Sequence, residues 1–236
     1  MQDKFLHFGI MINPEIRGSR LTRENYAQIC KKSTLGKNRI YMHAQNANDQ
    51  NLIDSYSKIY EDCEGLVYRD EWCEQHLIKV MQNFDLNMQF FQALNKEQYQ
   101  HEIERFLQIT EFVEITDLTN YSCPGYYVLV IEKYCQIYIG TSMDIKRRIR
   151  QHWMGGKMKF DRLLCGPVDK SKLSIDSFRA LDTTRIFVYP TEDIYSVEDK
   201  FINLFSKEFI CNRTAGGLME FGQLSVAANL KLRELG

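Results

Sequence analysis

Two short apolar runs in the second half of the chain constrain its fold more than any other feature. Residues 126–131 (YYVLVI) and 136–140 (QIYIG) are rich in β-branched and aromatic side chains. Only a few residues lie between the two runs, which is the spacing of a β-hairpin. The stretch before them, residues 119–125, is rich in turn formers, and Pro124 prevents any helix from continuing into the first run.

A helix and a third strand follow the hairpin. Ile145, Ile149 and Trp153 recur at four-residue spacing, which predicts a helix with one buried stripe. Residues 141–144 (TSMD) match a capping box at the start of that helix. Residues 185–189 (RIFVY) predict a third strand, after an irregular stretch over residues 155–182.

A second helix completes this unit. Residues 196–199 (SVED) match another capping box. The inward face of the helix that follows is apolar and consists of Val197, Phe201, Leu204 and Phe205. The order is therefore β-β-α-β-α. We expect an α+β fold with a small antiparallel three-stranded sheet flanked by helices and preceded by a mainly helical N-terminal region.

The chain before this unit is patterned as helices. Apolar residues recur at three- and four-residue spacing in three segments. Their members are Leu52, Ile53, Tyr56, Ile59 and Tyr60; Trp72, Leu77, Val80, Met81 and Phe84; and Tyr99, Ile103, Phe106 and Leu107. Thr22 is a suitable cap for a further helix that runs to about Lys32. We therefore divide the chain into a mainly helical region (1–116), the α/β unit (117–222) and a C-terminal helix (223–236).

Composition and hydropathy fit an ordinary globular protein. Of the 236 residues, 44% are hydrophobic and 26% are charged, and the mean hydropathy is −0.39. No apolar run is long enough to predict a membrane span, and the N-terminus has no secretion signal. The seven cysteines include no CxxC spacing, so we expect reduced thiols in a cytoplasmic protein rather than a zinc site.

Charge is unevenly distributed although the net charge is only −1. Seven basic residues and one acid lie between positions 17 and 39, and seven basic residues and two acids lie between positions 141 and 165. Two such stretches predict a phosphate-binding surface, although solvated helix faces carry the same pattern. The candidate nucleic-acid-binding residues are Arg17, Arg20, Arg39, Lys146, Arg147, Arg150, Lys157 and Lys159.

Six polar residues lie at positions of the α/β unit where chemistry is possible. They are Tyr127, Tyr138, Arg148, His152, Glu198 and Asn212. Arg148 and His152 are four residues apart, so they share one helix face. Taken singly, each of the six has an ordinary structural explanation, such as a packed strand aromatic, a surface charge or an acid at a helix terminus. Their order and spacing carry more information than any one of them.

Together these residues resemble the motifs of the GIY-YIG nuclease superfamily. Residues 125–127 (GYY) and 138–140 (YIG) are similar to its two signature tripeptides. Arg148 follows Tyr138 by ten residues and His152 follows Arg148 by four, as they do in that family. Glu198 and Asn212 match its later Glu and Asn. The resemblance covers about residues 124–217.

The resemblance has one departure within its motifs. Tyr126 stands where the family usually has Ile. Neighbouring strand residues face opposite sides of a sheet, so Tyr126 should point away from the face that carries Tyr127. We therefore expect this change to affect packing rather than chemistry. The segment between His152 and Arg185 is also long for a minimal member of the family.

The resemblance implies a metal-dependent site that hydrolyses phosphodiesters. Glu198 would be the protein ligand of Mg2+ or Mn2+, because such ions are held by one or two carboxylates together with waters and phosphate. Arg148 would donate to phosphate oxygens. A bound metal and a fixed guanidinium together would stabilise the charge that develops on the phosphate.

The resemblance also assigns roles to the remaining four residues. Tyr127 would be the general base, directly or through water. Its pKa, about 10 in model peptides, would have to be lowered by nearby positive charge. Tyr138 and His152 would orient the water or the base. Asn212 would hold backbone or phosphate, and a purely structural role in its turn is an equal alternative.

These roles point to nucleic acid as the substrate. We expect a DNA endonuclease of the restriction or mobile-element kind, in which the N-terminal region binds DNA and sets specificity. A structure-specific repair nuclease and a catalytically inactive nucleic-acid-binding module are alternatives, and the six intact candidates argue against the second. RNA as a substrate and a homodimer stay open, and no membrane partner is expected.

Overall fold

The computed structural model of the chain describes residues 3–13, 20–154, 158–194 and 197–212, and it has an α+β fold, as predicted. In chain order, the strands and helices are β1 (Phe5–His7), β2 (Ile10–Ile12), α1 (Arg23–Tyr26), α2 (Arg39–Asn46), α3 (Gln50–Ser57), α4 (Asp70–Ala93), α5 (Lys96–Ile109), β3 (Val113–Ile115), β4 (Gly125–Ile131), β5 (Gln136–Ser142), α6 (Ile145–Met154), β6 (Arg185–Pro190) and α7 (Glu198–Ile202). The C-terminal helix expected over residues 223–236 lies outside the described residues.

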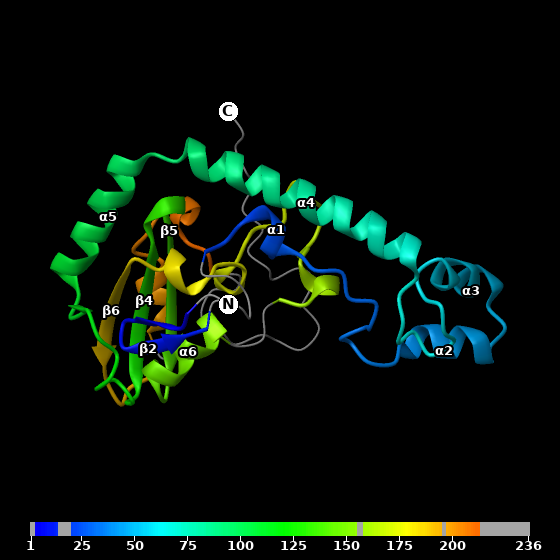
Figure 1. Cartoon of the computed structure of the whole chain (residues 1–236), viewed down its shortest axis with the longest axis horizontal. Coiled ribbons are helices and arrows are strands. Elements are labelled where there is room, and N and C mark those ends of the chain that lie inside the picture. Colours follow the sequence, from blue (N-terminus) through cyan, green and yellow to red (C-terminus); the bar gives the residue numbers. More distant parts are fainter. Residues whose placement is uncertain (1–2, 14–19, 155–157, 195–196, 213–236) are drawn as a thin grey trace.

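The main sheet of the fold is antiparallel and has the strand order β3-β6-β4-β5 (Figure 1). Both the predicted hairpin, β4 with β5, and the predicted third strand, β6, are present. The sequence predicts three strands, whereas this sheet has four. The added strand, β3, is only three residues long, so its side chains show no alternation that a sequence pattern could reveal. Because β3 belongs to the region assigned to helices, that region contributes directly to the sheet.

Both faces of the sheet are covered, which explains why its central strand reads as a continuous apolar run. Every residue of β4 is buried. On one face, Leu129 belongs to a core that includes α6 and β2. On the other face, Val128 belongs to a core shared with α5 and the segment around α7. Figure 1 shows α6 and β2 on one side of the strands and α5 on the other.

The first residues of the chain form a strand pair that sequence analysis did not predict. β1 and β2 pair in antiparallel fashion around Phe8 and Gly9, both of which have positive φ. This small sheet packs on α6, where the His7 and Trp153 rings lie 4.9 Å apart. The two strands are three residues each, too short for a clear sequence pattern. The N-terminal region is therefore helical only from α1 onward.

The first helix is shorter than predicted. Thr22 does cap it, since its side chain accepts from the Asn25 N–H, but α1 ends at Tyr26 instead of near Lys32. The following backbone pairs with another part of the chain: the Tyr68 N–H donates to the Lys31 carbonyl over 2.7 Å. Hydrogen bonds made in this extended pairing replace those of a longer helix, so tertiary contacts decide the conformation here.

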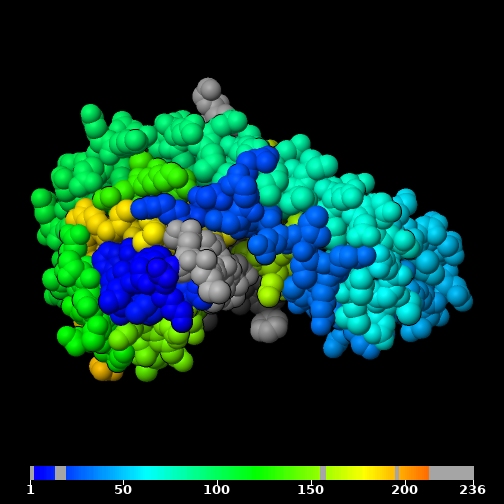
Figure 2. Space-filling model, viewed as in Figure 1, coloured from blue at the N-terminus to red at the C-terminus, as the bar shows by residue number. Residues whose placement is uncertain are grey.

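Helices α2 and α3 form a compact arm at the end of α4 that is remote from the sheet (Figures 1 and 2). Asn38 caps α2 and Asp49 caps α3 through their side-chain oxygens. Helix α4 has 24 residues, which corresponds to about 36 Å at 1.5 Å per residue. This long helix therefore connects the arm to the part of the molecule that contains the sheet.

Of the two predicted capping boxes, the one that lies wholly within the described residues does not begin its helix as expected. Thr141 lies within β5, and the cap of α6 is instead Asp144, whose Oδ1 accepts from the Arg147 N–H over 2.8 Å. Thr141 is held in the strand because it pairs with Tyr126 of β4. The second box includes Ser196, which lies outside the described residues, and α7 begins at Glu198.

Candidate active site

Tyr127 lies at the centre of the cluster that the motifs predict. It is completely buried on β4, and its hydroxyl lies 2.8 Å from Nε2 of His152. Gly140 sits opposite it on β5, and a Cβ at that position would lie 2.5 Å from the Tyr127 hydroxyl. The glycine of the second tripeptide is therefore needed to make room for the tyrosine of the first.

Tyr138 and His152 complete the aromatic part of the cluster. Tyr138 lies on β5 diagonally across from Tyr127, and their ring centroids are 6.1 Å apart. The ring of His152 meets that of Tyr138 edge to face at 4.9 Å. His152 projects from α6 and is only 4% exposed. Two strands and one helix thus hold three side chains in mutual contact.

Arg148 lies one turn before His152 on α6 and supplies the positive charge of the cluster. Its guanidinium interacts with the Tyr127 hydroxyl and lies near Tyr138 and Asp176. Burial opposes its charge, but the neighbouring tyrosines and Asp176 outweigh burial and raise its pKa. Arg148 is nevertheless an exposed residue. Arg148 can therefore donate to an anion that arrives from solvent while it contacts Tyr127.

The pKa values of the two tyrosines bear on how Tyr127 could act as a base. Burial raises the pKa of Tyr127 well above its usual value, Tyr138 raises it further, and Arg148 opposes both effects. Burial likewise raises the pKa of Tyr138 to about 12, again opposed by Arg148. The expected lowering by Arg148 is thus outweighed by desolvation. To act as a base, Tyr127 has to pass its proton to a neighbouring acceptor.

Glu198 opens α7 and is the carboxylate of the cluster. It is partly buried, and burial first and Asp199 second raise its pKa to about 7, while Arg148 opposes the rise. Its charge also raises the pKa of Tyr138, so the two side chains interact electrostatically. The described residues contain no group of three or more His, Cys, Asp or Glu side chains that could enclose a metal. A single carboxylate nevertheless fits Mg2+, which keeps several waters and binds substrate phosphate.

Asn212 lies beside the cluster and bonds to the sheet rather than to the other five candidates. Its Nδ2 donates to the Ile139 carbonyl over 2.6 Å, and its Oδ1 accepts from the Ile139 N–H at 3.1 Å. Just before it, the Cys211 N–H donates to the Ile137 carbonyl. Residues 210–212 therefore run along the outer edge of β5 and close it. This geometry supports the structural alternative for Asn212.

Asp176 is a member of the cluster that sequence analysis missed. Its Oδ1 lies 3.4 Å from Nδ1 of His152, on the opposite side of the ring from Tyr127. It belongs to a 3-10 turn, Ile175–Ser177, in the irregular segment between α6 and β6. No periodicity marks this segment, so only the folded structure reveals the contact.

Tyr126 faces away from the cluster, as predicted, but it acts on the same region from the other side. Its ring packs against Tyr189 and Phe201 in the second core. Its hydroxyl accepts from the Val197 N–H over 3.3 Å, directly before Glu198. Where the family usually has Ile, this chain thus has a hydroxyl that ties the start of α7 to β4.

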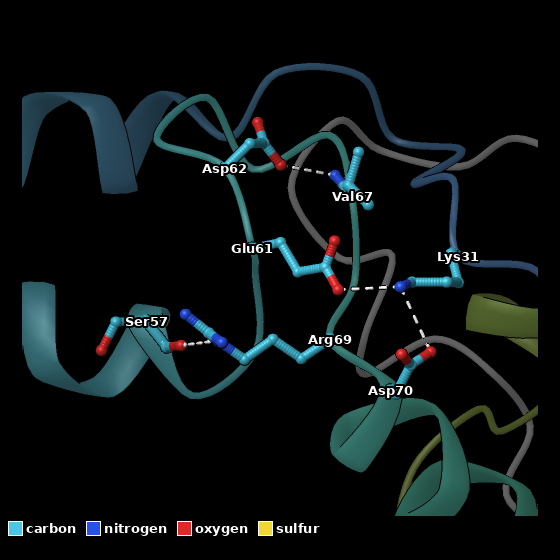
Figure 3. Close-up of polar contacts among 7 residues, drawn as sticks. All are labelled: Lys31, Ser57, Glu61, Asp62, Val67, Arg69 and Asp70. Carbon is cyan, nitrogen blue, oxygen red and sulfur yellow. Dashed lines mark hydrogen bonds and ion pairs between the residues drawn. The ribbon is translucent and has the colours of Figure 1, made fainter.

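Four basic residues of the N-terminal stretch, of which only Arg20 is a candidate for nucleic-acid binding, make contacts within the chain. Arg20 donates to the Leu181 carbonyl over 2.7 Å. Three other basic residues of that stretch form ion pairs, namely Arg23 with Asp85, Lys31 with Glu61 and Asp70, and Lys37 with Glu64. Figure 3 shows Lys31 between its two carboxylates at the base of the arm. Arg39 is exposed on the arm, and Arg17 lies outside the described residues.

The basic candidates on and near α6 are more accessible to a ligand from solvent. Arg147, Arg150 and Lys159 are exposed, whereas Lys146 donates to the Thr119 carbonyl over 3.4 Å. Lys157 lies outside the described residues. Arg147 and Arg150 share α6 with Arg148, so the exposed side of this helix carries positive charge beside the cluster.

Comparison with known proteins gives no relative. No family model matches the chain, and no curated protein and no solved structure is detectably similar to it. Among the described residues, no helix combines the length and the apolar character needed to span a membrane.

Proposed function

We propose that this chain is a metal-dependent endonuclease of the GIY-YIG type that hydrolyses phosphodiester bonds in DNA. The observation that carries the proposal is the contact between Tyr127 and His152, with Tyr138, Arg148 and Glu198 around it. Four of the six residues that match the family motifs thus meet on one side of the β4–β5 hairpin, and Glu198 interacts electrostatically with two of them, Tyr138 and Arg148. If these residues served only to stabilise the fold, this particular set of residue types would not be required in one place.

Each residue has a chemical task in this reaction. Arg148 binds the phosphate and stabilises its developing charge through fixed donors. Tyr127 removes a proton from the attacking water, and His152, 2.8 Å away, accepts the proton that Tyr127 gives up. Tyr138 packs on both and fixes their orientation. Glu198 would hold Mg2+ or Mn2+, and the bound ion would supply Lewis-acid stabilisation of the phosphate and of the leaving oxygen.

The test is cleavage of supercoiled, linear and branched DNA with and without MgCl2. We expect cutting only with the divalent metal, and Glu198→Ala should abolish it while thermal unfolding stays similar to that of the wild type. Undiminished cutting in EDTA, or wild-type activity in Glu198→Ala, would contradict the proposal. Preference for branched DNA would indicate the repair type, and cutting of linear DNA at fixed sites would indicate the restriction type.

A pair of neighbouring tyrosines provides a matched comparison. Tyr127→Phe removes the hydroxyl that faces His152, so the rate should fall by about 100-fold or more. Tyr126→Phe removes the hydroxyl that faces Val197 on the other side of the sheet and should have a much smaller effect. Equal loss in the two variants would show that the hydroxyl of Tyr127 has no special role in the chemistry.

A further inference from the structure

His152 is held between two oxygen atoms, one on each ring nitrogen. Nε2 lies 2.8 Å from the Tyr127 hydroxyl, and Nδ1 lies 3.4 Å from Oδ1 of Asp176. The side chain of His152 is 3% exposed, whereas that of Asp176 is 41% exposed. The three side chains thus form a chain of contacts that runs from the buried sheet to the surface.

The two contacts favour one of the two neutral forms of the His152 ring. A neutral imidazole has one donor and one acceptor nitrogen. A carboxylate only accepts, so Asp176 favours the form in which Nδ1–H donates to it. Nε2 is then unprotonated and accepts the O–H of Tyr127. This is the arrangement that His152 needs in order to remove the tyrosine proton.

We propose that Asp176 is a positioning residue for the hydrolysis, acting through His152 on Tyr127. It fixes the tautomer and orientation of the imidazole, and it stabilises the imidazolium that forms when the tyrosine proton is transferred. This inference rests on the proposed function, because the transfer matters only if Tyr127 serves as the base. Asp176 matches none of the family motifs found in the sequence; its contact with His152 alone assigns the role.

Burial explains why such a residue is needed. Tyr127 is completely buried, and desolvation disfavours its charged form. A phenolate left beside a neutral histidine would therefore be costly. If the proton moves to His152, the phenolate gains a positive neighbour at hydrogen-bonding distance. Asp176 on the far nitrogen then balances that positive charge, and its contact with solvent limits its own desolvation.

The proton balance of the step is complete. The Tyr127 O–H bond breaks, and its proton forms an N–H bond at Nε2 of His152. Water then gives a proton to the Tyr127 oxygen, and the resulting hydroxide forms a bond to phosphorus as the bond to the leaving oxygen breaks. The leaving oxygen takes a proton from solvent, and His152 returns its proton to solvent. The net reaction consumes one water and yields a phosphate monoester and an alcohol.

Other charged and titratable groups also face His152. Tyr138 meets its ring from β5, Tyr127 meets it from β4, and Arg148 precedes it by one turn on α6. Arg148 also lies near Asp176 and interacts with it electrostatically. Replacement of Asp176 therefore changes the field at Arg148 as well. The test needs a measurement specific to the histidine ring.

The experiment compares Asp176→Asn, Asp176→Glu and a control, Asp169→Asn. Asp169 is an exposed acid of the same connecting segment, so the control makes the same charge change away from His152. Cleavage of supercoiled plasmid in MgCl2 gives kcat and KM as functions of pH. 15N NMR of histidine-labelled protein, assigned with His152→Gln, shows which nitrogen of His152 is protonated. Thermal unfolding confirms that each variant is folded.

We expect Asp176→Asn to lower kcat by about 10- to 100-fold with little change in KM, similar to the loss when a metal-bound histidine loses its outer partner. Its amide can donate to Nδ1, so the NMR spectrum should show protonation shifting toward Nε2. Asp176→Glu should restore part of kcat, and Asp169→Asn should resemble the wild type. Loss of kcat without any change in the tautomer would overturn the proposed route through His152.

The design separates this inference from the proposed function. If the wild type cuts DNA but Asp176→Asn matches Asp169→Asn in kcat and in the NMR spectrum, the positioning role is wrong while the nuclease assignment stands. If the wild type cuts no DNA, the nuclease assignment fails, and a role for Asp176 in hydrolysis fails with it. In that case a tautomer shift in Asp176→Asn would show only that the two side chains interact.

Discussion

At the scale of single residues, Gly140 leaves no space for a side chain beside Tyr127. A Cβ there would lie 2.5 Å from the tyrosine hydroxyl, so Gly140→Ala should displace Tyr127 from His152. We expect DNA cleavage to fall by about tenfold or more, since a small misplacement of a reacting group is enough to cause such a loss.

A second glycine gives a matched control for this change. Gly36 lies on the arm at φ +74°, and a Cβ there would meet nothing within 4 Å. Gly36→Ala should therefore lower stability by about 1 kcal/mol through backbone strain alone and leave cleavage unchanged. Equal rates for the Gly140→Ala variant and the wild type would show that Tyr127 tolerates the extra methyl group.

Two half-buried histidines, His7 and His76, lead to a prediction about how stability depends on pH. Burial lowers the pKa of both His7 and His76 from 6.5, with hydrogen bonds to the Thr183 and Phe160 carbonyls opposing the change. The folded protein therefore binds these protons less readily than the unfolded chain does. Above pH 6.5 both histidines are neutral in the folded and unfolded states, and stability is complete. As the pH falls from 6.5 through the lower pKa values of the folded protein, stability is lost.

Urea unfolding between pH 7.5 and pH 5 measures this dependence. The wild type should lose stability across that range, and a variant with both His7→Gln and His76→Gln should lose less. Glutamine retains a donor for each carbonyl and cannot titrate. The same slope in both proteins would assign the pH dependence to other groups.

At the scale of secondary-structure elements, Asn212 fixes the outer edge of β5. Asn212→Ala removes both hydrogen bonds to Ile139, which we expect to lower the free energy of unfolding by about 1–3 kcal/mol. Cleavage by the remaining folded protein at saturating DNA should be near normal, because Asn212 bonds to the strand rather than to the cluster. Asn203→Ala, at an exposed position, is the control. A large loss of kcat at unchanged stability would instead place Asn212 in the chemistry.

The elements that could be predicted from sequence are those in which a pattern of apolar residues extends over several helical turns or along several strand residues. The β4–β5 hairpin, α4, α5 and α6 all carry such repeats. Strands of three residues, such as β3, do not. The end of α1 at Tyr26 depends on backbone pairing with a distant segment, which residue preferences cannot reveal.

The candidate site likewise contains residues that could be predicted from sequence and residues that could not. Tyr127, Tyr138, Arg148 and His152 lie on regular elements, so their spacing predicts that they meet. Asp176 lies in a segment without repeats, and its approach to His152 follows only from how that segment folds. The partner of Asn212 is a backbone group, and any residue could supply one, so the sequence leaves its role open.

At the scale of the whole molecule, the distribution of charge makes a prediction about DNA binding. Arg147 and Arg150 are exposed on α6 beside the cluster, whereas Arg23 and Lys37 are engaged in ion pairs within the chain. Replacing Arg147 and Arg150 by Ala should weaken DNA binding. It should also reduce the slope of log K against log salt by roughly one per lost phosphate contact.

The control is the double replacement of Arg23 and Lys37 by Ala, which removes the same formal charge from the N-terminal stretch. Because both residues already face carboxylates, we expect a much smaller change in the salt dependence. Titrations at several salt concentrations compare the two pairs. A larger effect of the control pair would indicate that the N-terminal stretch, not α6, makes the main DNA contacts. Arg39→Ala tests the arm separately, since Arg39 is exposed there.

The length of α4 has a consequence for how far the protein could reach along a duplex. Its 24 residues span about 36 Å, close to one turn of B-form DNA, or about ten base pairs. Among the described residues, the arm lies at only one end of α4 (Figure 1). If the proposed nuclease binds DNA with α4 along the duplex, a single copy of the chain would shield one flank of the break about a turn further than the other. The two ends that it leaves would differ in how long they remain covered.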